Sequence, residues 1–112
     1  MKLRSIVGVA LACASLSACA KNPESIAPMT MPINAYSGLD CRQLGSEHQK
    51  TSLQLQQVEA AQRQAVTGDA VGVFLIGVPV SSLSGSDRAG EVAQYKGEMV
   101  AIESAQRNRH CM

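Results

Sequence analysis

The sequence is poor in aromatic residues and in charge. Its 112 residues include no tryptophan, one phenylalanine and two tyrosines, and charged residues make up 17% of the chain. It has no cluster of lysine and arginine able to displace counterions from a phosphate backbone, which excludes nucleic acid as a partner. No apolar run approaches the roughly 20 residues that a helix needs to cross a bilayer.

The motifs of common enzymes are also missing. No glycine-rich phosphate loop follows a strand, and no CxxC or HxxxH spacing indicates a metal site. Ser84 and Ser86 read as turn residues without a matching His–Asp arrangement. His48 and His110 are interpreted as surface polar residues. We therefore expect a non-enzymatic protein without a cofactor or a resident metal.

The N-terminus has the three parts of a secretory leader. Lys2 and Arg4 give it positive charge, an apolar stretch of about 11 residues follows, and small residues precede Cys19. Leu16, Ser17, Ala18 and Cys19 form a tetrapeptide that resembles the lipobox of bacterial lipoprotein signal sequences. The resemblance implies removal of residues 1–18 and lipidation of Cys19, with diacylglycerol on its sulfur and an acylated amine. The alternatives are an ordinary secretory leader or an N-terminal membrane helix.

The residue after Cys19 bears on location. Ala20 stands where an aspartate would favour retention in the inner membrane, so the pattern resembles outer-membrane sorting in enteric bacteria. We expect a bacterial cell-envelope protein that is lipid-anchored in the outer membrane and faces the periplasm. Its direct partner is then membrane lipid, held through acylated Cys19.

Two cysteines remain after cleavage and lipidation. Cys41 and Cys111 form an even pair in an oxidising compartment, which predicts a disulfide. The loop it closes spans nearly the whole folded region, and chain-entropy arguments put its value at about 4 kcal/mol as an upper figure. The alternative is a metal site formed by the two cysteines and His110, with His48 as a further candidate ligand.

Residues 19–38 are predicted to be the acylated cysteine and a flexible tether. The segment is rich in turn formers, and three prolines interrupt any helix in it: Pro23, Pro28 and Pro32. Met29 and Met31 form a short thioether pair of the kind that binds Cu(I). The simpler interpretation is that these methionines dock on the folded domain.

Residues 39–112 are predicted to be an all-α domain, a disulfide-closed antiparallel helical hairpin. The first helix is expected from Asp40 to about Val66, with Asp40 and Gln43 in a capping box. The second is expected from Asp87 to about Arg109. The first helix carries a thin stripe at spacings of three and four: Cys41, Leu44, His48, Thr51, Leu55, Val58, Gln62 and Ala65.

Glycines and capping residues refine the second helix. Gly90 and Gly97 are interpreted as points of close approach to the first helix. Ser84 and Asp87 are expected to cap its start.

Residues 70–80, here called the apex, are almost entirely apolar. We favour a continuation of the first helix through them, kinked at Gly68 or Gly72 and ended by Pro79. Such an extension leaves apolar surface that must be covered, either by folding back, by another protein chain, or by a membrane leaflet. The candidate interaction residues are Phe74, Leu75, Ile76 and Val78.

The order of these features is similar to that of a group of small bacterial and phage-associated lipoproteins without an assigned function. The likeness rests on the lipobox, the proline-rich segment, the apolar run ending at Pro79, Lys96-Gly97-Glu98, and the final Cys111. It implies a helical hairpin lipoprotein and transfers no catalytic residue. We expect an interaction or structural module, with self-association or an envelope protein at the apex. The alternative is a membrane-active, lysis-type lipoprotein.

Overall fold

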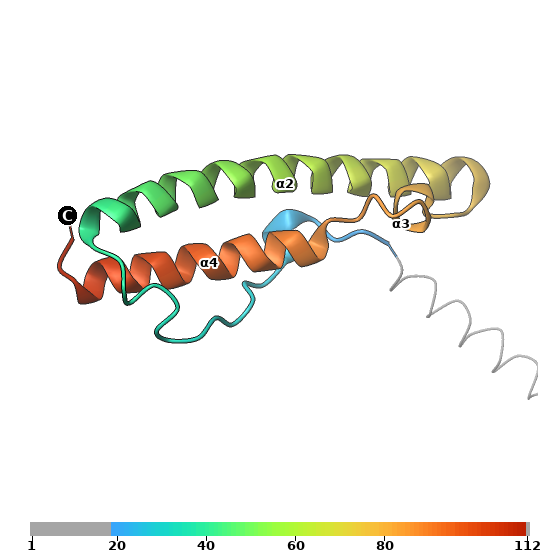
Figure 1. Ribbon diagram of the computed structural model, residues 1–112. Helices are drawn as coiled ribbons and strands as arrows, with labels where there is room; N and C mark the ends of the chain where they lie inside the picture. Colours follow the sequence, from blue (N-terminus) through green and yellow to red (C-terminus); the bar gives the residue numbers. More distant parts are fainter. Residues whose placement is uncertain (1–18, 112) are drawn as a thin grey trace, which may run out of the picture.

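The computed structural model describes residues 19–111, which form an elongated all-helical hairpin. Its elements are a 3-10 turn η1 (Pro23–Ser25) and the helices α2 (Cys41–Ile76), α3 (Val80–Leu83) and α4 (Ala89–Asn108). The described residues extend over 65 × 28 × 18 Å and contain no strand. Figure 1 shows α2 and α4 side by side, with the chain of residues 19–40 running along them. The predicted all-α hairpin is confirmed, whereas the expected signal peptide lies outside the described residues.

The start of α2 is fixed by two local devices. The Asp40 carboxylate accepts a hydrogen bond of 2.8 Å from the Gln43 backbone N–H, and the Gln43 side chain accepts one of 3.0 Å from the Asp40 N–H. This is the predicted capping box. The next residue, Cys41, is joined to Cys111 by a disulfide, with 5.5 Å between the two Cα atoms. The covalent link closes the hairpin at the end opposite its turn, as predicted.

Helix α2 continues into the apex, as far as Ile76, rather than ending near Val66. Its 36 residues run past Gly68 and Gly72, so the predicted continuation is confirmed. The predicted end at Pro79 is wrong, because the helix stops three residues earlier, at Ile76. Its C-cap residue is Gly77, which adopts a left-handed conformation with φ of 76° and donates its N–H to the Val73 carbonyl at 3.0 Å. Glycine adopts this conformation without the steric penalty of a side chain.

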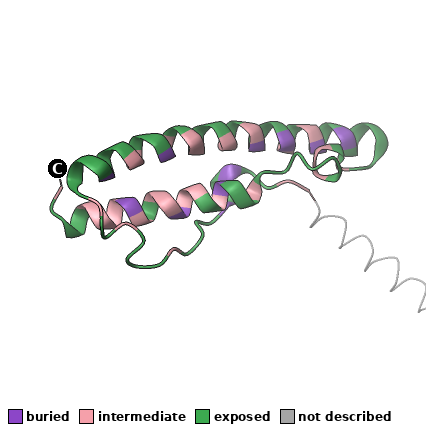
Figure 2. Ribbon diagram, viewed as in Figure 1, coloured by how far each residue is buried: buried purple, intermediate pink, exposed green. Residues whose placement is uncertain are grey.

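The core between α2 and α4 is thin. Its buried apolar side chains are Leu44 and Ala65 on α2 and Val92 and Ile102 on α4, joined by Ile26 of the N-terminal chain. Figure 2 shows the buried positions of α2 along the side of the helix that faces α4 and the folded-back chain. The predicted stripe correctly places Leu44, Thr51, Gln62 and Ala65 in the core.

Two predictions about α4 are wrong in detail. A methyl group at Gly97 would overlap the carbonyl oxygen of Met29, so the close neighbour is the N-terminal chain and not α2. Gly90 has open space around it and marks no close approach.

The second prediction concerns the start of α4, which the sequence predicts to be capped by Ser84 and Asp87. The N-cap residue is Arg88, which makes no side-chain capping bond. The Asp87 carboxylate accepts a hydrogen bond of 3.0 Å from the Ala89 N–H.

Candidate functional site

Cys19 lies against the apex half of α2. It lines a small surface hollow of about 250 Å³ together with Ala20 and four α2 residues, Val66, Asp69, Ala70 and Val73. Its thiol is free and partly exposed. The proposed lipidation site and the apolar apex are therefore neighbours in space, although more than 40 residues separate them in the sequence.

Asp69 holds the residue that follows Cys19. Its buried carboxylate accepts a hydrogen bond of 2.7 Å from the Ala20 N–H, one of 2.8 Å from the Ser82 N–H, and a further one from the Ser82 hydroxyl. Burial would raise the pKa of Asp69, but the hydrogen bonds from Ser82 and Ala20 outweigh burial and lower the pKa below its usual value. One carboxylate thus connects the N-terminal chain, α2 and α3.

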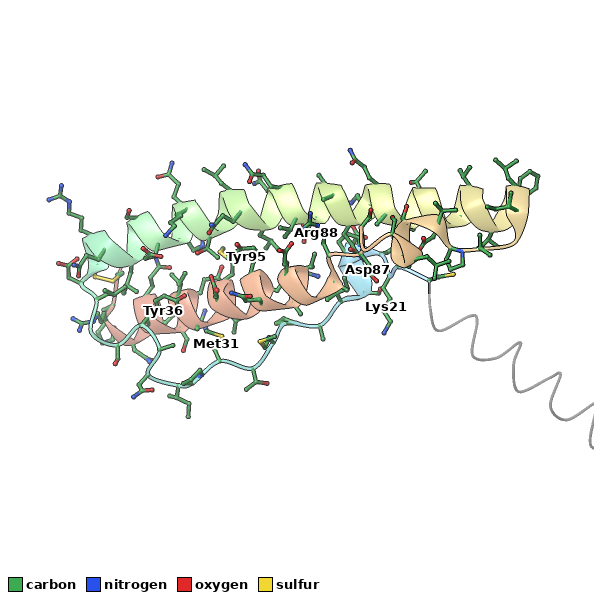
Figure 3. The ribbon with its side chains drawn as sticks, turned by 45° about the vertical axis from the view of Figure 1, so that its right-hand side comes forward. Lys21, Met31, Tyr36, Asp87, Arg88 and Tyr95 are labelled. Carbon is green, nitrogen blue, oxygen red and sulfur yellow. A yellow bond between two sulfur atoms is a disulfide. The ribbon has the colours of Figure 1, made fainter. Side chains whose placement is uncertain are left out.

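Gln62 holds the next residue of the N-terminal chain in the same manner. Its fully buried side chain donates to the Lys21 carbonyl at 2.8 Å and to the Asp87 carboxylate at 2.9 Å, and it accepts from the Arg88 N–H at 2.5 Å. Figure 3 shows Lys21, Asp87 and Arg88 gathered where the N-terminal chain meets the start of α4. Every hydrogen-bonding group of this amide is engaged, which fixes the chain segment it holds.

The segment that the sequence predicts as a flexible tether, residues 20–38, lies along the hairpin instead of projecting from it. The Lys96 ammonium donates to the carbonyls of Pro23 and Ile26, and the Met29 N–H donates to the Ala93 carbonyl at 2.8 Å. An exposed ion pair joins the N-terminal chain to α2, between Glu24 and Arg63 at 2.6 Å.

The C-terminal end of the hairpin holds the segment too. The Arg109 guanidinium donates to the Ser37 carbonyl at 2.7 Å. Such long-range backbone contacts order a proline-rich stretch that has no regular structure of its own.

The apex is covered on one side only. Chain 78–83 folds back onto α2, where a methyl group at Gly72 would lie 2.6 Å from the Val78 carbonyl oxygen, and one at Gly68 would overlap the Ser81 hydroxyl. On the other side Phe74, Leu75 and Ile76 remain 88%, 69% and 68% exposed. Folding back therefore covers part of the predicted apolar extension and leaves its outermost turn open.

No charged side chain occurs between residues 70 and 86. Leu83 of α3 adds to the exposed apolar surface, and Val78, the fourth predicted interaction residue, is also exposed, at 38%. Large exposed apolar surfaces on small proteins commonly mark contact with another molecule.

The other predicted site residues lie at the opposite end of the hairpin or along its side. Cys41 and Cys111 are consumed by the disulfide, so the alternative metal site built on them is wrong. His48 lies 3.3 Å from the Glu103 carboxylate, and His110 is exposed at the end of α4. Within residues 19–111 no cluster of three His, Cys, Asp or Glu side chains is arranged to bind a metal ion.

Met29 and Met31 line a shallow groove of about 410 Å³ beside α4. The groove walls are mainly apolar and small, and they include Gly97, Val100 and Ala101. These contacts correspond to the simpler of the two interpretations, in which the methionines dock on the domain.

The sequence interpretation missed Asp69 and assigned Gln62 only to the helix stripe. The missed signal was periodic: Asp69 follows Ala65 by four residues and so continues the buried face of α2 with a polar residue. Polar residues at buried positions need partners, and here the partners come from the N-terminal chain.

No protein family model, curated protein or solved structure matches the chain. Among the described residues, none of the helices combines the length and the apolar character required to traverse a bilayer.

Proposed function

We propose that the chain is a lipid-anchored lipoprotein of the bacterial cell envelope, acylated at Cys19, that acts as a non-enzymatic interaction or structural module. The observation that carries the proposal is the lipobox directly followed by a folded chain, since ordered contacts begin at Ala20. A mature protein beginning at Cys19 would place its lipid directly beside the hairpin.

Two further observations support the proposal. The Cys41–Cys111 disulfide fits a periplasmic location, where such bonds form and persist. The hairpin offers exposed apolar side chains at one end, and the clefts on it are shallow surface hollows. A scaffold of this kind is suited to contact with a surface.

The test is metabolic labelling with an alkyne fatty acid, followed by separation of the inner and outer membranes. We expect the label in the outer-membrane fraction, and we expect Cys19→Ala to abolish it. Cys13→Ala is the matched control, because Cys13 lies in the leader and would be removed with it. Label that survives Cys19→Ala, or a wild-type protein that stays unlabelled, would contradict the proposal.

A second candidate function is a membrane-active role. The observation that favours it is the uncharged, exposed outer turn of α2, which includes Phe74 and Ile76. Induced expression of the lipidated protein should then release a periplasmic marker enzyme, and the double variant Phe74→Asp, Ile76→Asp should not. Cells that retain the marker at matched protein levels exclude this role.

A further inference from the structure

The N-terminal chain leaves Cys19 little freedom relative to the hairpin. Ala20 is bound to Asp69 and Lys21 to Gln62, and both anchoring side chains belong to α2 and are buried. From Asp69 to Ile76 the helix rises only about 10 Å. A lipid carried by Cys19 would thus emerge within a few turns of the tip of α2.

The surface next to this point is apolar and without charge. Phe74, Leu75 and Ile76 form the exposed outer turn, and Leu83 of α3 is 70% exposed. The charged residues that flank this stretch in the sequence are hydrogen-bonded within the hairpin: Asp69 accepts from the Ser82 N–H, and Asp87 accepts from the Gln62 side chain. Of the cations further away, Arg63 is paired to Glu24 and Arg88 to Glu91, whereas Lys21 is exposed. The outer turn of α2 itself therefore offers hydrophobic contact and carries no charge that would attract anionic headgroups.

We propose that the apex is a second membrane contact, which inserts shallowly into the same leaflet that holds the acyl chains of Cys19. The inference rests on the proposed lipidation. In this arrangement Phe74, Leu75 and Ile76 enter the boundary between headgroups and acyl chains. The disulfide end of the 65 Å hairpin points away from the bilayer.

The position of Cys19 favours a membrane leaflet over another protein chain as the partner that covers the exposed side of the apex. An acyl chain in the bilayer brings its attachment point to the membrane surface, and the neighbouring turn of α2 comes with it. A second protein chain could cover this turn of α2 only by taking the place of the membrane surface. The contact is shallow because the apex is too short to cross the bilayer.

The apex contributes orientation rather than attachment. Two or more acyl chains already give stable anchoring, so polar substitutions at the apex should leave the protein on the membrane. An experiment on membrane binding alone would miss the contact, and the readout must report depth. Because the chain contains no tryptophan, a single introduced indole is a clean probe.

The experiment uses the full-length protein, acylated in cells, purified, and reconstituted into phosphatidylcholine vesicles with or without brominated acyl chains. The apex probe is the variant Phe74→Trp, at a position that is 88% exposed. The two control probes are Ile33→Trp, which lies beside Arg109 near the disulfide end, and Leu53→Trp on the outer face of α2. Helical content is compared first, so that each variant is known to be folded.

We expect brominated lipid to quench most of the indole fluorescence of the apex probe and to leave that of both control probes nearly unchanged. A high-salt buffer should not alter this result, because the contact is apolar. Equal quenching of all three probes would show a hairpin lying flat and would overturn the proposal. An unquenched apex probe whose emission shifts with protein concentration would assign the apex to self-association and overturn it as well.

The design separates the two proposals from each other. Vesicle flotation and the mass of the N-terminal peptide report acylation independently of indole depth. Absence of acyl mass and of flotation contradicts the proposed function. An acylated protein that floats with an unquenched apex probe contradicts only the apex contact.

Discussion

At its first turn α2 is held by a capping box and a disulfide, whereas its last turn carries three exposed apolar side chains and is covered on one side by the short helix α3. Between these ends, the packing partner changes. The first part of α2 packs against α4, where His48 meets Glu103, whereas Asp69 near its end holds the N-terminal chain and α3. Figure 1 shows that α2 extends well past the start of α4.

The difference shows how one helix can serve two purposes. The disulfide end gains stability from a covalent link and from apolar packing around Leu44 and Ile102. The apex end is assembled by buried polar anchors, Gln62 and Asp69, which attach the N-terminal chain and α3. Polar anchors specify position more than they stabilise, which suits the end whose geometry the proposed function depends on.

The largest expected effect is at the disulfide end. Replacing both Cys41 and Cys111 by serine removes a link between residues 70 positions apart, and we expect a loss of about 4 kcal/mol in the free energy of unfolding. Urea unfolding followed by circular dichroism measures it. Cys19→Ser is the control, since that thiol makes no disulfide. A loss no larger than that of the control would show that packing alone holds this end.

The next effect is at the apex end. Asp69→Asn leaves a carboxamide where three donors meet, and we expect a loss of about 1–3 kcal/mol at neutral pH. Since the native pKa of Asp69 is lowered, its contribution is present above the unfolded pKa of about 3.9 and is lost as the pH falls through the lower native value.

Stability measured against pH tests the same residue. Below about pH 4 the wild type should lose stability more steeply than Asp69→Asn. Asp40→Asn replaces one good helix cap by another and serves as the control. If stability varies with pH in the same way in the wild type and in Asp69→Asn, then the Asp69 carboxylate does not anchor the N-terminal chain and α3.

A smaller effect separates two glycines of α4. Gly97→Ala forces a methyl group against the Met29 carbonyl, so we expect a net loss of about 1 kcal/mol despite the better helix propensity of alanine. Gly90→Ala meets open space and should stabilise by up to about 1 kcal/mol. Thermal unfolding compares them, and equal stabilisation by both would mean that the N-terminal chain does not lie on α4.

The smallest effect on stability is expected at the apex surface. Phe74→Ala removes a large side chain that is almost fully exposed, so the free energy of unfolding should change by less than about 0.5 kcal/mol. Leu44→Ala removes a smaller side chain that is fully buried and should cost about 2–5 kcal/mol. A large loss for Phe74→Ala in dilute, lipid-free solution would show that the apex is part of the core.

The helices could be predicted from local sequence signals, whereas the course of the N-terminal chain could not. The capping box at Asp40, the buried stripe from Leu44 to Ala65 and the paired cysteines are all readable from neighbouring residues. The contact between Ala20 and Asp69 joins residues 49 positions apart, and proline-rich sequence carries no periodicity that predicts where it docks. Gly97 was recognised as a close contact, but its partner could not be chosen from helix periodicity alone.

The most direct test of the account is the position of Cys19 on the hairpin. A spin label attached to the Cys19 thiol of the unlipidated chain 19–112 should broaden the amide signals of Val66, Ala70 and Val73 in NMR spectra. It should leave those of Leu44 and Thr51 sharp, because they lie toward the disulfide end. Weak and even broadening along the whole of α2 would instead show a freely moving tether, and would contradict the placement of the lipid beside the apex.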